Sequence, residues 1–584
     1  MNRSINKVGV LGSGVMGSQI ACHMANIGLE VILLDIVPKE AEDSKDKKAR
    51  NQIVNGALQK ALNSNPSPVY SKSVVQHITT GNFDDDLNKI EDCDWIIEAV
   101  IERLDIKQSL FEKVENHRKA GAVISTNTSG IPINMMLDGR SDDFKKHFLG
   151  THFFNPPRYL ELLEIIPGKE TDPEVVDFMM HYGRKFIGKK TVLSKDTPAF
   201  IANRIGIFSI MTLFHQFRSL GLSIEDVDKL TGPVLGRPKS ATFRTADVVG
   251  LDTLLLVADG LKNNLKKDEA VEVFDAPNFI KKMADNDMLG SKSGKGFYKK
   301  VKNKKGESEI LTLDPETLEY RERKKSSFQT LEQTKSISDL NERMPVLFAG
   351  KDQAGEFYRA SFTALFQYAT RRIPEIADEL YRIDDALKAG FGWKQGPFEA
   401  WDAIGFERAL TEMEKTNQKP ADWVYAMKDS GITSFYKVEN GVRYFYDIEA
   451  GEYREIPGQK EVLLLDVLRE ENTVWSNAES TIVDLGDGIL NLEFHSKMNT
   501  IGQEIIQGIN TAIDMAEKEY KGLVISNTGD NFSAGANVGM IFMFAVEQEM
   551  DELEYAVRTF QKTMMRVRYS NIPVVVAPHQ MALG

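Results

Sequence analysis

Cysteine is nearly absent from this chain of 584 residues. Only Cys22 and Cys93 occur, which excludes a disulfide scaffold and a cysteine-rich metal site. We expect no metal centre, and a reducing compartment such as the cytoplasm. The first residues run straight into a short strand-like segment without the apolar core of a signal peptide, which agrees with an intracellular protein.

Long apolar runs and an excess of positive charge are also missing. No uninterrupted apolar run approaches the roughly 18 residues of a membrane span. The chain has 72 basic and 85 acidic residues, a net charge of −13. No global basic field is therefore present to hold nucleic acid or anionic lipid, and any polyanion site must be local. We predict no membrane span and no nucleic-acid partner.

The composition is instead that of a soluble globular protein, with 42% apolar and 27% charged residues. A length of 584 residues suggests about four domains. Up to about residue 190, short apolar runs alternate with longer amphipathic ones, which predicts a parallel sheet with crossover helices. The strand-like runs are Val8–Leu11, Val31–Leu34, Trp95–Val100 and Ala122–Ser125.

Two helical segments follow, and the second reads as a degenerate copy of the first. Residues 247–252 (DVVGLD) are echoed by residues 402–407 (DAIGFE), and Phe243 and Phe398 precede the matching aspartates by four residues. No cofactor-binding half precedes the copy, so its expected role is packing. Beyond it, Asn440-Gly441 predicts a hairpin, and strand-like runs around helices from about residue 474 predict a second α/β unit.

A glycine-rich turn after the first strand predicts a dinucleotide site. It reads Gly12-Ser13-Gly14-Val15-Met16-Gly17 and opens a helix. The first glycine makes the tight turn, the second lets the backbone approach the pyrophosphate, and the third lets helix and strand pack closely. Asp35 ends the second strand, where a carboxylate binds ribose hydroxyls and repels a 2′-phosphate. We therefore expect NAD rather than NADP.

A histidine and a glutamate suit the oxidation of an alcohol by NAD. The reaction needs a base for the hydroxyl proton, and histidine serves near neutral pH when a carboxylate orients its other nitrogen. His152 lies in THFFNPP, and Glu164 lies in the otherwise apolar run LELLEII. A buried carboxylate is expensive unless paired, which favours a His152–Glu164 pair over two unrelated residues.

At these residues the chain resembles the 3-hydroxyacyl-CoA dehydrogenase family. The resemblance covers Lys7 to about Tyr298 and rests on four motifs in order. They are GSGVMG at 12–17, TNTS at 126–129, HFFNP at 152–156 and KDTPAF at 195–200. It implies oxidation of (3S)-3-hydroxyacyl-CoA to 3-oxoacyl-CoA with NAD, in fatty-acid β-oxidation.

The resemblance also assigns residues to roles. It makes His152 the general base and Glu164 its partner. Ser129 and Asn203 would contact the substrate, with Ser129 also near the nicotinamide, and Asn155 would support His152, substrate and cofactor. The residues implied to line the cofactor cleft are Glu102, Lys107 and Lys292. Coenzyme A is polyanionic, and residues 45–50 (KDKKAR) are either a local basic site for it or a solvated helical face.

The C-terminal unit resembles the crotonase, or enoyl-CoA hydratase, family in FHSKMNT at 494–500 and DNFSAGAN at 530–537. The resemblance implies that the backbone N–H of Ala536 is one oxyanion-hole donor. The second donor and the catalytic glutamates of that family lie beyond Gly584, where this sequence stops. We therefore expect an incomplete crotonase unit without hydratase activity and with exposed apolar surface.

The predicted fold class is α/β, and the function is NAD-dependent 3-hydroxyacyl-CoA oxidation. Two alternatives stay open: a catalytically silent subunit that binds NAD or acyl-CoA, and a short-chain 3-hydroxybutyryl-CoA dehydrogenase. Acyl-CoA is the expected substrate, a thiolase or other β-oxidation protein a candidate partner, and a homodimer a candidate assembly. The predicted domains are a Rossmann-like NAD-binding domain at 1–192, a helical domain at 193–300, a hairpin and linker at 301–340, a second helical domain at 341–450 and an incomplete crotonase-like domain at 470–584.

Overall fold

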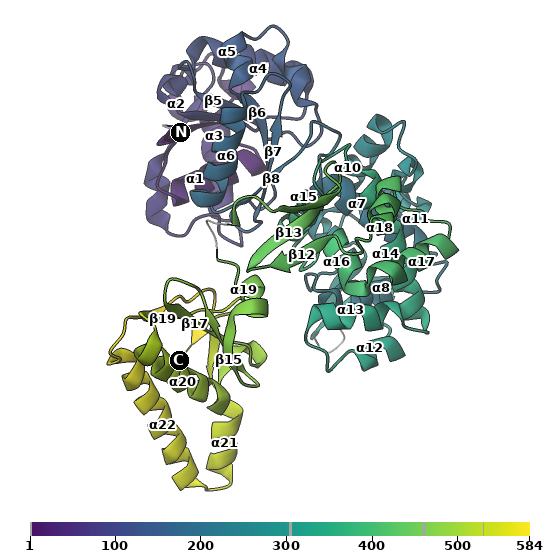
Figure 1. Ribbon diagram of the computed structural model, residues 1–584. Coiled ribbons are helices and arrows are strands. Elements are labelled where there is room, and N and C mark those ends of the chain that lie inside the picture. The colour runs from purple at the N-terminus through teal and green to yellow at the C-terminus, as the bar shows by residue number, and fades with distance from the viewer. Residues whose placement is uncertain (1–2, 303–305, 460–462, 530, 584) are drawn as a thin grey trace. The chain divides into compact units, whose positions relative to one another are not determined.

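The computed structural model describes residues 3–302, 306–459, 463–529 and 531–583 (Figure 1). Part of the polar linker (303–305), Asp530 of the crotonase-like motif and the last residue, Gly584, lie outside the described residues. The chain divides into two compact units, Met1–Phe435 and Tyr436–Gly584. The finer domain limits given above stay predictions.

The first unit begins with an eight-stranded sheet in the order β3-β2-β1-β4-β5-β6-β7-β8. Strands β1 to β6 run parallel to their neighbours, β7 is antiparallel to β6, and β8 is parallel to β7. The strand order reverses between β1 and β4, which is where ligands bind in open α/β sheets. The strands are β1 (Lys7–Leu11), β2 (Glu30–Asp35), β3 (Ile78–Asn82), β4 (Trp95–Glu98), β5 (Val123–Thr126), β6 (Phe148–Phe153), β7 (Leu162–Pro167) and β8 (Lys190–Leu193).

Helices cover both faces of this sheet, as Figure 1 shows in purple and blue. One buried core joins the sheet to α1, α3 and α6, and a second joins the other face to α4 and α5. Because both faces are covered, the central strands are mostly apolar, with polar residues such as Glu98 and Thr126 at their carboxyl ends. The helices are α1 (Val15–Asn26), α2 (Lys47–Arg50), α3 (Gln52–Leu62), α4 (Leu104–His117), α5 (Asp142–Lys146) and α6 (Pro173–Lys185).

The first helical segment follows β8 and ends in a small antiparallel sheet, β9-β10-β11. Its long first helix, α7, is buried along most of its length. The elements are α7 (Ala202–Gln216), α8 (Ile224–Thr231), α9 (Phe243–Val249), α10 (Leu251–Asn264), α11 (Asn278–Asp285), β9 (Tyr298–Lys302), β10 (Ser308–Leu313) and β11 (Tyr320–Glu322).

The second helical segment repeats the local structure of the first. Asp247 accepts a hydrogen bond from the backbone N–H of Phe297, and Asp402 accepts the matching bond from Phe435. Each motif has its glycine at a positive φ near 100°, which favours glycine. The geometry thus supports the predicted duplication. The helices are α12 (Gln329–Gln333), α13 (Leu340–Phe348), α14 (Gln353–Arg371), α15 (Leu380–Phe391), α16 (Pro397–Ile404), α17 (Phe406–Lys415) and α18 (Asp422–Asp429).

The second unit starts with the predicted hairpin, β12 (Tyr436–Glu439) and β13 (Val442–Asp447), to which β14 (Glu452–Glu455) adds. A five-stranded sheet, β15-β16-β17-β19-β21, then packs against α20. The remaining elements are α19 (Leu465–Asn472), β15 (Thr473–Ser476), β16 (Ser480–Asp484), β17 (Ile489–Phe494), β18 (Thr500–Ile501), α20 (Gln503–Glu519), β19 (Gly522–Ile525), β20 (Ser533–Ala536), α21 (Val538–Val546), α22 (Met550–Arg568), β21 (Val574–Val576) and β22 (Ala582–Leu583).

None of the helices in the described ranges has both the length and the apolar character that crossing a membrane requires.

Candidate active site

The three glycines where β1 leads into α1 differ in the space around them, as their spacing predicts. Gly12 has a φ of 102°, and a Cβ there would lie 2.6 Å from the carbonyl oxygen of Ala99. A Cβ on Gly17 would lie 1.8 Å from the carbonyl oxygen of Gly12. At Gly14, by contrast, such a Cβ would have no heavy atom of the described residues within 4 Å. The backbone is thus packed at Gly12 and Gly17 and open at Gly14, where the spacing predicts that a pyrophosphate approaches.

The open glycine lies at the beginning of α1. Gly14 is the N-cap, so the first N–H groups of the helix, from Val15 and Met16 onward, are available to an anion. Val15 is exposed, whereas Met16 packs against the core on this face of the sheet. The free N–H groups and the open space at Gly14 fit the pyrophosphate of NAD.

Asp35 is held beside this turn. Its Oδ2 accepts hydrogen bonds from the backbone N–H and the hydroxyl of Ser13, at 2.6 and 2.5 Å. Since β2 neighbours β1, the carboxylate lies at the edge of the sheet where a ribose would follow the pyrophosphate. Ile36 and Ile101, just beyond the ends of β2 and β4, are exposed apolar side chains at this edge. Neither isoleucine was predicted from the sequence, although Ile36 directly follows Asp35, the carboxylate that ends β2.

Glu102 and Lys107 belong to a buried ionic network. Lys107 is 1% exposed on α4, and its Nζ lies 2.8 Å from both oxygens of Glu98 and 3.3 Å from Glu102. The other Glu102 oxygen accepts hydrogen bonds from the backbone N–H groups of Ser129 and Gly130, at 3.0 and 3.1 Å. Lys107 therefore supports Glu102 from the interior, and Glu102 fixes the loop that carries Ser129.

The same contacts keep Glu102 charged. Burial acts to raise the pKa of Glu102, but the charge of Lys107 and the hydrogen bond from Thr128 outweigh it, so that its pKa is below the usual value. Glu102 is therefore a fixed negative charge next to the Ser129 loop. The sequence did not reveal Glu98, which completes this network.

His152 and Glu164 form a direct pair. They are opposite residues of the antiparallel strands β6 and β7, so their side chains share one face of the sheet. The Nδ1 atom of His152 lies 2.7 Å from Oε2 of Glu164. Glu164 is fully buried and His152 is 4% exposed. The pairing inferred from the cost of an isolated buried carboxylate is thus present in the structure.

The beginning of α7 holds the second oxygen of Glu164. The backbone N–H groups of Ile201 and Ala202 donate to Oε1 at 3.0 and 2.9 Å. The positive end of a helix dipole stabilises a carboxylate in this position. Asn203 is the next residue of α7, so the contact that orients Glu164 also fixes the start of the helix that carries Asn203.

Ser129 lies on the other side of the imidazole. Its Oγ is 3.1 Å from Nε2 of His152. A carboxylate can only accept, so Nδ1 of His152 carries the ring proton, and Nε2 of the neutral ring is an acceptor. The Ser129 hydroxyl then donates to Nε2. The arrangement leaves a basic nitrogen facing a hydroxyl, as proton abstraction from an alcohol requires.

The structure places the remaining predicted residues as follows. Asn155 follows β6 and is exposed in the loop after His152. Lys292 forms an ion pair with Asp252 in the first helical segment, and in the described residues it does not contact the glycine turn. In the basic segment 45–50, Arg50 binds Asp85 and the carbonyl oxygen of Glu42, so its charge is already used.

Comparison with known proteins identifies the family. Residues 7–197 match the family model "3-hydroxyacyl-CoA dehydrogenase, NAD binding domain", and residues 200–300 match its C-terminal domain. A probable 3-hydroxyacyl-CoA dehydrogenase from Bacillus subtilis is 45% identical over all of this chain and 74% of its own length. The chain belongs to the 3-hydroxyacyl-CoA dehydrogenase family. The predicted family, α/β fold class, NAD cofactor and oxidoreductase function are thereby confirmed.

One further relative and one solved structure are similar to more of the chain than its NAD-binding domain. A Rickettsia felis protein named as a trifunctional enzyme of a fatty acid oxidation complex is 31% identical over the whole chain and 76% of its own length. The crystal structure of 3-hydroxybutyryl-CoA dehydrogenase from Escherichia coli covers 74% of this chain and all of its own, at 19% identity and a TM-score of 0.53. That likeness shows a shared fold.

Proposed function

We propose that this chain oxidises (3S)-3-hydroxyacyl-CoA thioesters to 3-oxoacyl-CoA in fatty-acid β-oxidation, with NAD as the acceptor. The observation that carries the proposal is the line Ser129–His152–Glu164, in which one imidazole contacts a hydroxyl at 3.1 Å and a buried carboxylate at 2.7 Å. Ser129, at one end of this line, lies on a loop after β5. Glu102 holds this loop at the carboxyl edge of the sheet by accepting a hydrogen bond from the Ser129 N–H.

The chemistry of the chain's own residues is a proton transfer. His152 accepts the hydroxyl proton of the substrate on Nε2, and Glu164 stabilises the imidazolium that forms through Nδ1. NAD, when bound, supplies the hydride acceptor. Because His152 and Glu164 are almost completely buried, little water is present to screen the new charge.

Three polar side chains would position the substrate. Ser129 faces the reacting nitrogen, and its hydroxyl can pass its hydrogen bond to the substrate oxygen. Asn203 on α7 and Asn155 after β6 offer amide groups for the thioester and the cofactor. Holding the hydroxyl-bearing carbon in one orientation is the contribution that such side chains make to hydride transfer.

The proposal is tested by NADH oxidation that depends on acetoacetyl-CoA. Wild-type protein should turn over, and His152→Ala should lose turnover while it keeps its affinity for NADH. No turnover by folded wild-type protein that binds NADH would contradict the proposal.

Both alternatives stay distinguishable by experiment. A silent binding subunit would bind NADH and acyl-CoA without turnover, but it has no need of a paired buried histidine and glutamate. A short-chain 3-hydroxybutyryl-CoA dehydrogenase would prefer the four-carbon thioester over longer ones. Where such an enzyme used NADPH, Asp35 beside the ribose site would oppose the 2′-phosphate. A chain-length series of substrates separates it from the main proposal.

The remaining expectations concern partners and the C-terminal unit. Helices α14 and α15 already pack on α7 within this chain, so a homodimer must use other surfaces. A thiolase partner and a cytoplasmic location stay predictions. In the second unit Ala536 ends β20, half-buried, and its part in an oxyanion hole also stays a prediction. Measuring hydration of crotonyl-CoA would test the expected lack of hydratase activity.

A further inference from the structure

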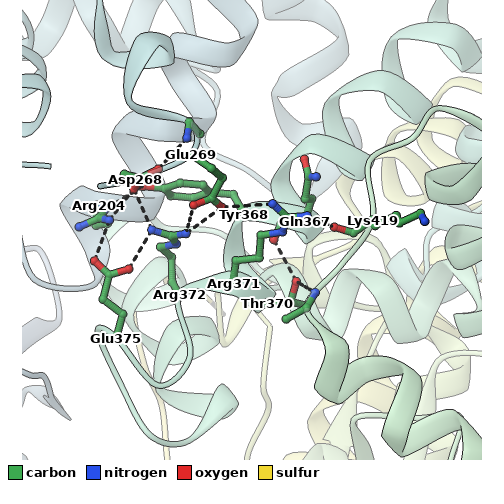
Figure 2. Close-up of polar contacts among 12 residues, drawn as sticks. Arg204, Asp268, Glu269, Gln367, Tyr368, Thr370, Arg371, Arg372, Glu375 and Lys419 are labelled. Atoms are coloured by element: carbon green, nitrogen blue, oxygen red, sulfur yellow. Dashed lines mark hydrogen bonds and ion pairs between the residues drawn. The ribbon is translucent and has the colours of Figure 1, made fainter. Parts of the chain in front are cut away.

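A charged cluster with a buried centre joins the two helical segments (Figure 2). We call it the Arg204 cluster, and it consists of Arg204 from α7, Asp268 and Glu269 from the loop after α10, Tyr368 from α14, and Arg372 and Glu375 from the loop after α14. None of these residues belongs to the proton-transfer line described above. The two arginines and Asp268 are buried, whereas the side chains of Glu269 and Glu375 are 40% and 39% exposed.

Arg204 is the centre of the cluster and is fully buried. Its Nε donates to the Tyr368 hydroxyl at 2.6 Å, and its Nη2 donates to Asp268 at 2.5 Å and to Glu375 at 2.9 Å. A guanidinium bound on several sides has one orientation, because its donors form a rigid fork. The backbone of Arg204 is therefore held in place from the second helical segment.

Tyr368 adds a second point of attachment on the same helix. Its hydroxyl accepts from Arg204 and donates to Asp268 at 2.8 Å. Its ring stacks on Phe208, with the centroids 3.8 Å apart and the planes at 6°. Arg204 and Phe208 are four residues apart and so lie on one face of α7. Two contacts one turn apart fix both the rotation and the axial position of the helix.

The fixed turn of α7 is the one that serves the active site. Ile201 and Ala202 donate their N–H groups to Glu164, Asn203 follows, and Arg204 comes next. A rotation or shift of this turn would move both N–H donors away from Glu164 and would move Asn203 with them. Glu164 in turn holds His152.

We propose that Arg204 and Tyr368 are positioning residues for the His152–Glu164 pair. The second helical segment then has a role in catalysis besides packing: through Tyr368 it sets the start of α7, and α7 sets Glu164. This inference rests on the proposed dehydrogenase function. It extends that function to a segment outside the matched family domains, which end at residue 300.

Tyr368→Phe is the mildest test, because it removes one hydroxyl and keeps the ring on Phe208. We expect kcat for acetoacetyl-CoA reduction to fall about tenfold, the scale of a sub-ångström misplacement of reacting groups. The KM for NADH should stay within about twofold, since the glycine turn and Asp35 lie elsewhere in the fold. If the substitution only weakened packing, it would lower the melting temperature but would not lower kcat while leaving the KM for NADH unchanged.

Tyr358→Phe is the matched control. Tyr358 lies on the same helix, is also buried, and its hydroxyl donates to the carbonyl oxygen of Leu230 at 3.0 Å, again across to the first helical segment. It does not contact Arg204 in the described structure. We expect wild-type kcat from this variant. Arg204→Lys should lower kcat as Tyr368→Phe does, and the double variant should lose less than the product of the two effects, because the residues act through one contact.

Hydrogen exchange gives a readout that does not depend on turnover. In Tyr368→Phe the backbone amides of residues 199–204 should exchange faster than in wild type, and in Tyr358→Phe they should not. Wild-type kcat together with wild-type exchange in Tyr368→Phe, or equal kcat losses in both variants, would overturn the inference. Inactive wild-type protein would instead overturn the proposed function, and the exchange comparison would still decide whether Tyr368 fixes the start of α7.

Discussion

Glu164 faces His152 across two antiparallel strands and touches its Nδ1 atom at 2.7 Å, while the opposite oxygen of the carboxylate accepts two N–H groups from the start of α7. Both carboxylate oxygens of Glu164 thus have hydrogen-bond partners, and the carboxylate holds the imidazole in one orientation. The carboxylate fixes the tautomer in which Nε2 is the base.

Glu164→Gln should keep the fold and lose most of the activity. An amide in this place can present its NH2 group to Nδ1 and favour the wrong tautomer, which in a comparable histidine–carboxylate pair costs about 10⁴-fold in kcat. We expect a loss of at least about 10²-fold with unchanged NADH affinity. Glu161→Gln is the control, since Glu161 lies three residues away and is exposed. Equal activities of the two variants would contradict the role of Glu164.

Gly14→Ala and Gly17→Ala should differ in kind. A Cβ on Gly14 enters open space, so this variant should melt like wild type but bind NADH at least about tenfold more weakly, because the methyl group occupies pyrophosphate space. A Cβ on Gly17 would meet the carbonyl oxygen of Gly12 at 1.8 Å, so this variant should lose stability itself. Thermal melts with and without NADH measure both effects. Normal NADH binding by stable Gly14→Ala would contradict this placement of the cofactor.

Glu225 should contribute stability that disappears in acid. Burial acts to raise its pKa, but the two-pronged contact with Arg321 and backbone hydrogen bonds outweigh burial and lower it to about 2. A lowered folded pKa stabilises the protein above the unfolded value near 4.3. That contribution is lost as the pH falls toward 2. Glu225→Gln should therefore cost about 2 kcal/mol near pH 7 and almost nothing near pH 2.

Unfolding by denaturant at the two pH values measures this difference. Glu316→Gln is the control, because the ion pair of Glu316 with Arg218 is exposed and should contribute little at either pH. A cost for Glu225→Gln that does not change with pH would contradict the assigned cause.

Helix α21 should bind hydrophobic dyes. None of its side chains is buried in the described structure, and Val538, Phe542, Met543 and Val546 are each more than half exposed. Contiguous apolar surface of this kind promotes association. Phe542→Ser should lower dye fluorescence and aggregation, whereas Leu256→Ser, at an exposed leucine of α10, should not. Equal effects of both substitutions would show that α21 is not the responsible surface.

Local features of the site were predictable from the sequence. The spacing of Gly12, Gly14 and Gly17 after an apolar run predicts the turn, because its backbone conformation depends on residues close in the sequence. Asp35 follows from the length of one β-α-β unit. The His152–Glu164 pair was predictable as chemistry, because a carboxylate in an apolar run needs a partner.

The features that depend on tertiary packing were not predictable. The register that sets His152 opposite Glu164 comes from the β6–β7 ladder, which the alternation of residues does not specify. The ion pairs of Lys107 with Glu98 and Glu102 in the interior also follow no local pattern, and its place at the cofactor cleft stays a prediction. The Arg204 cluster joins residues more than 160 positions apart in the chain, and no local pattern marks such a contact.

The most direct test of the account is the oxidation of (3S)-3-hydroxybutyryl-CoA by NAD, followed as NADH formation, beside the (3R) enantiomer and beside the His152→Gln variant. The account predicts turnover of the (3S) thioester, little with the (3R) thioester, and a loss of at least about 10²-fold in the variant, because its amide cannot take the proton. Equal turnover of both enantiomers, or full activity of His152→Gln, would contradict it.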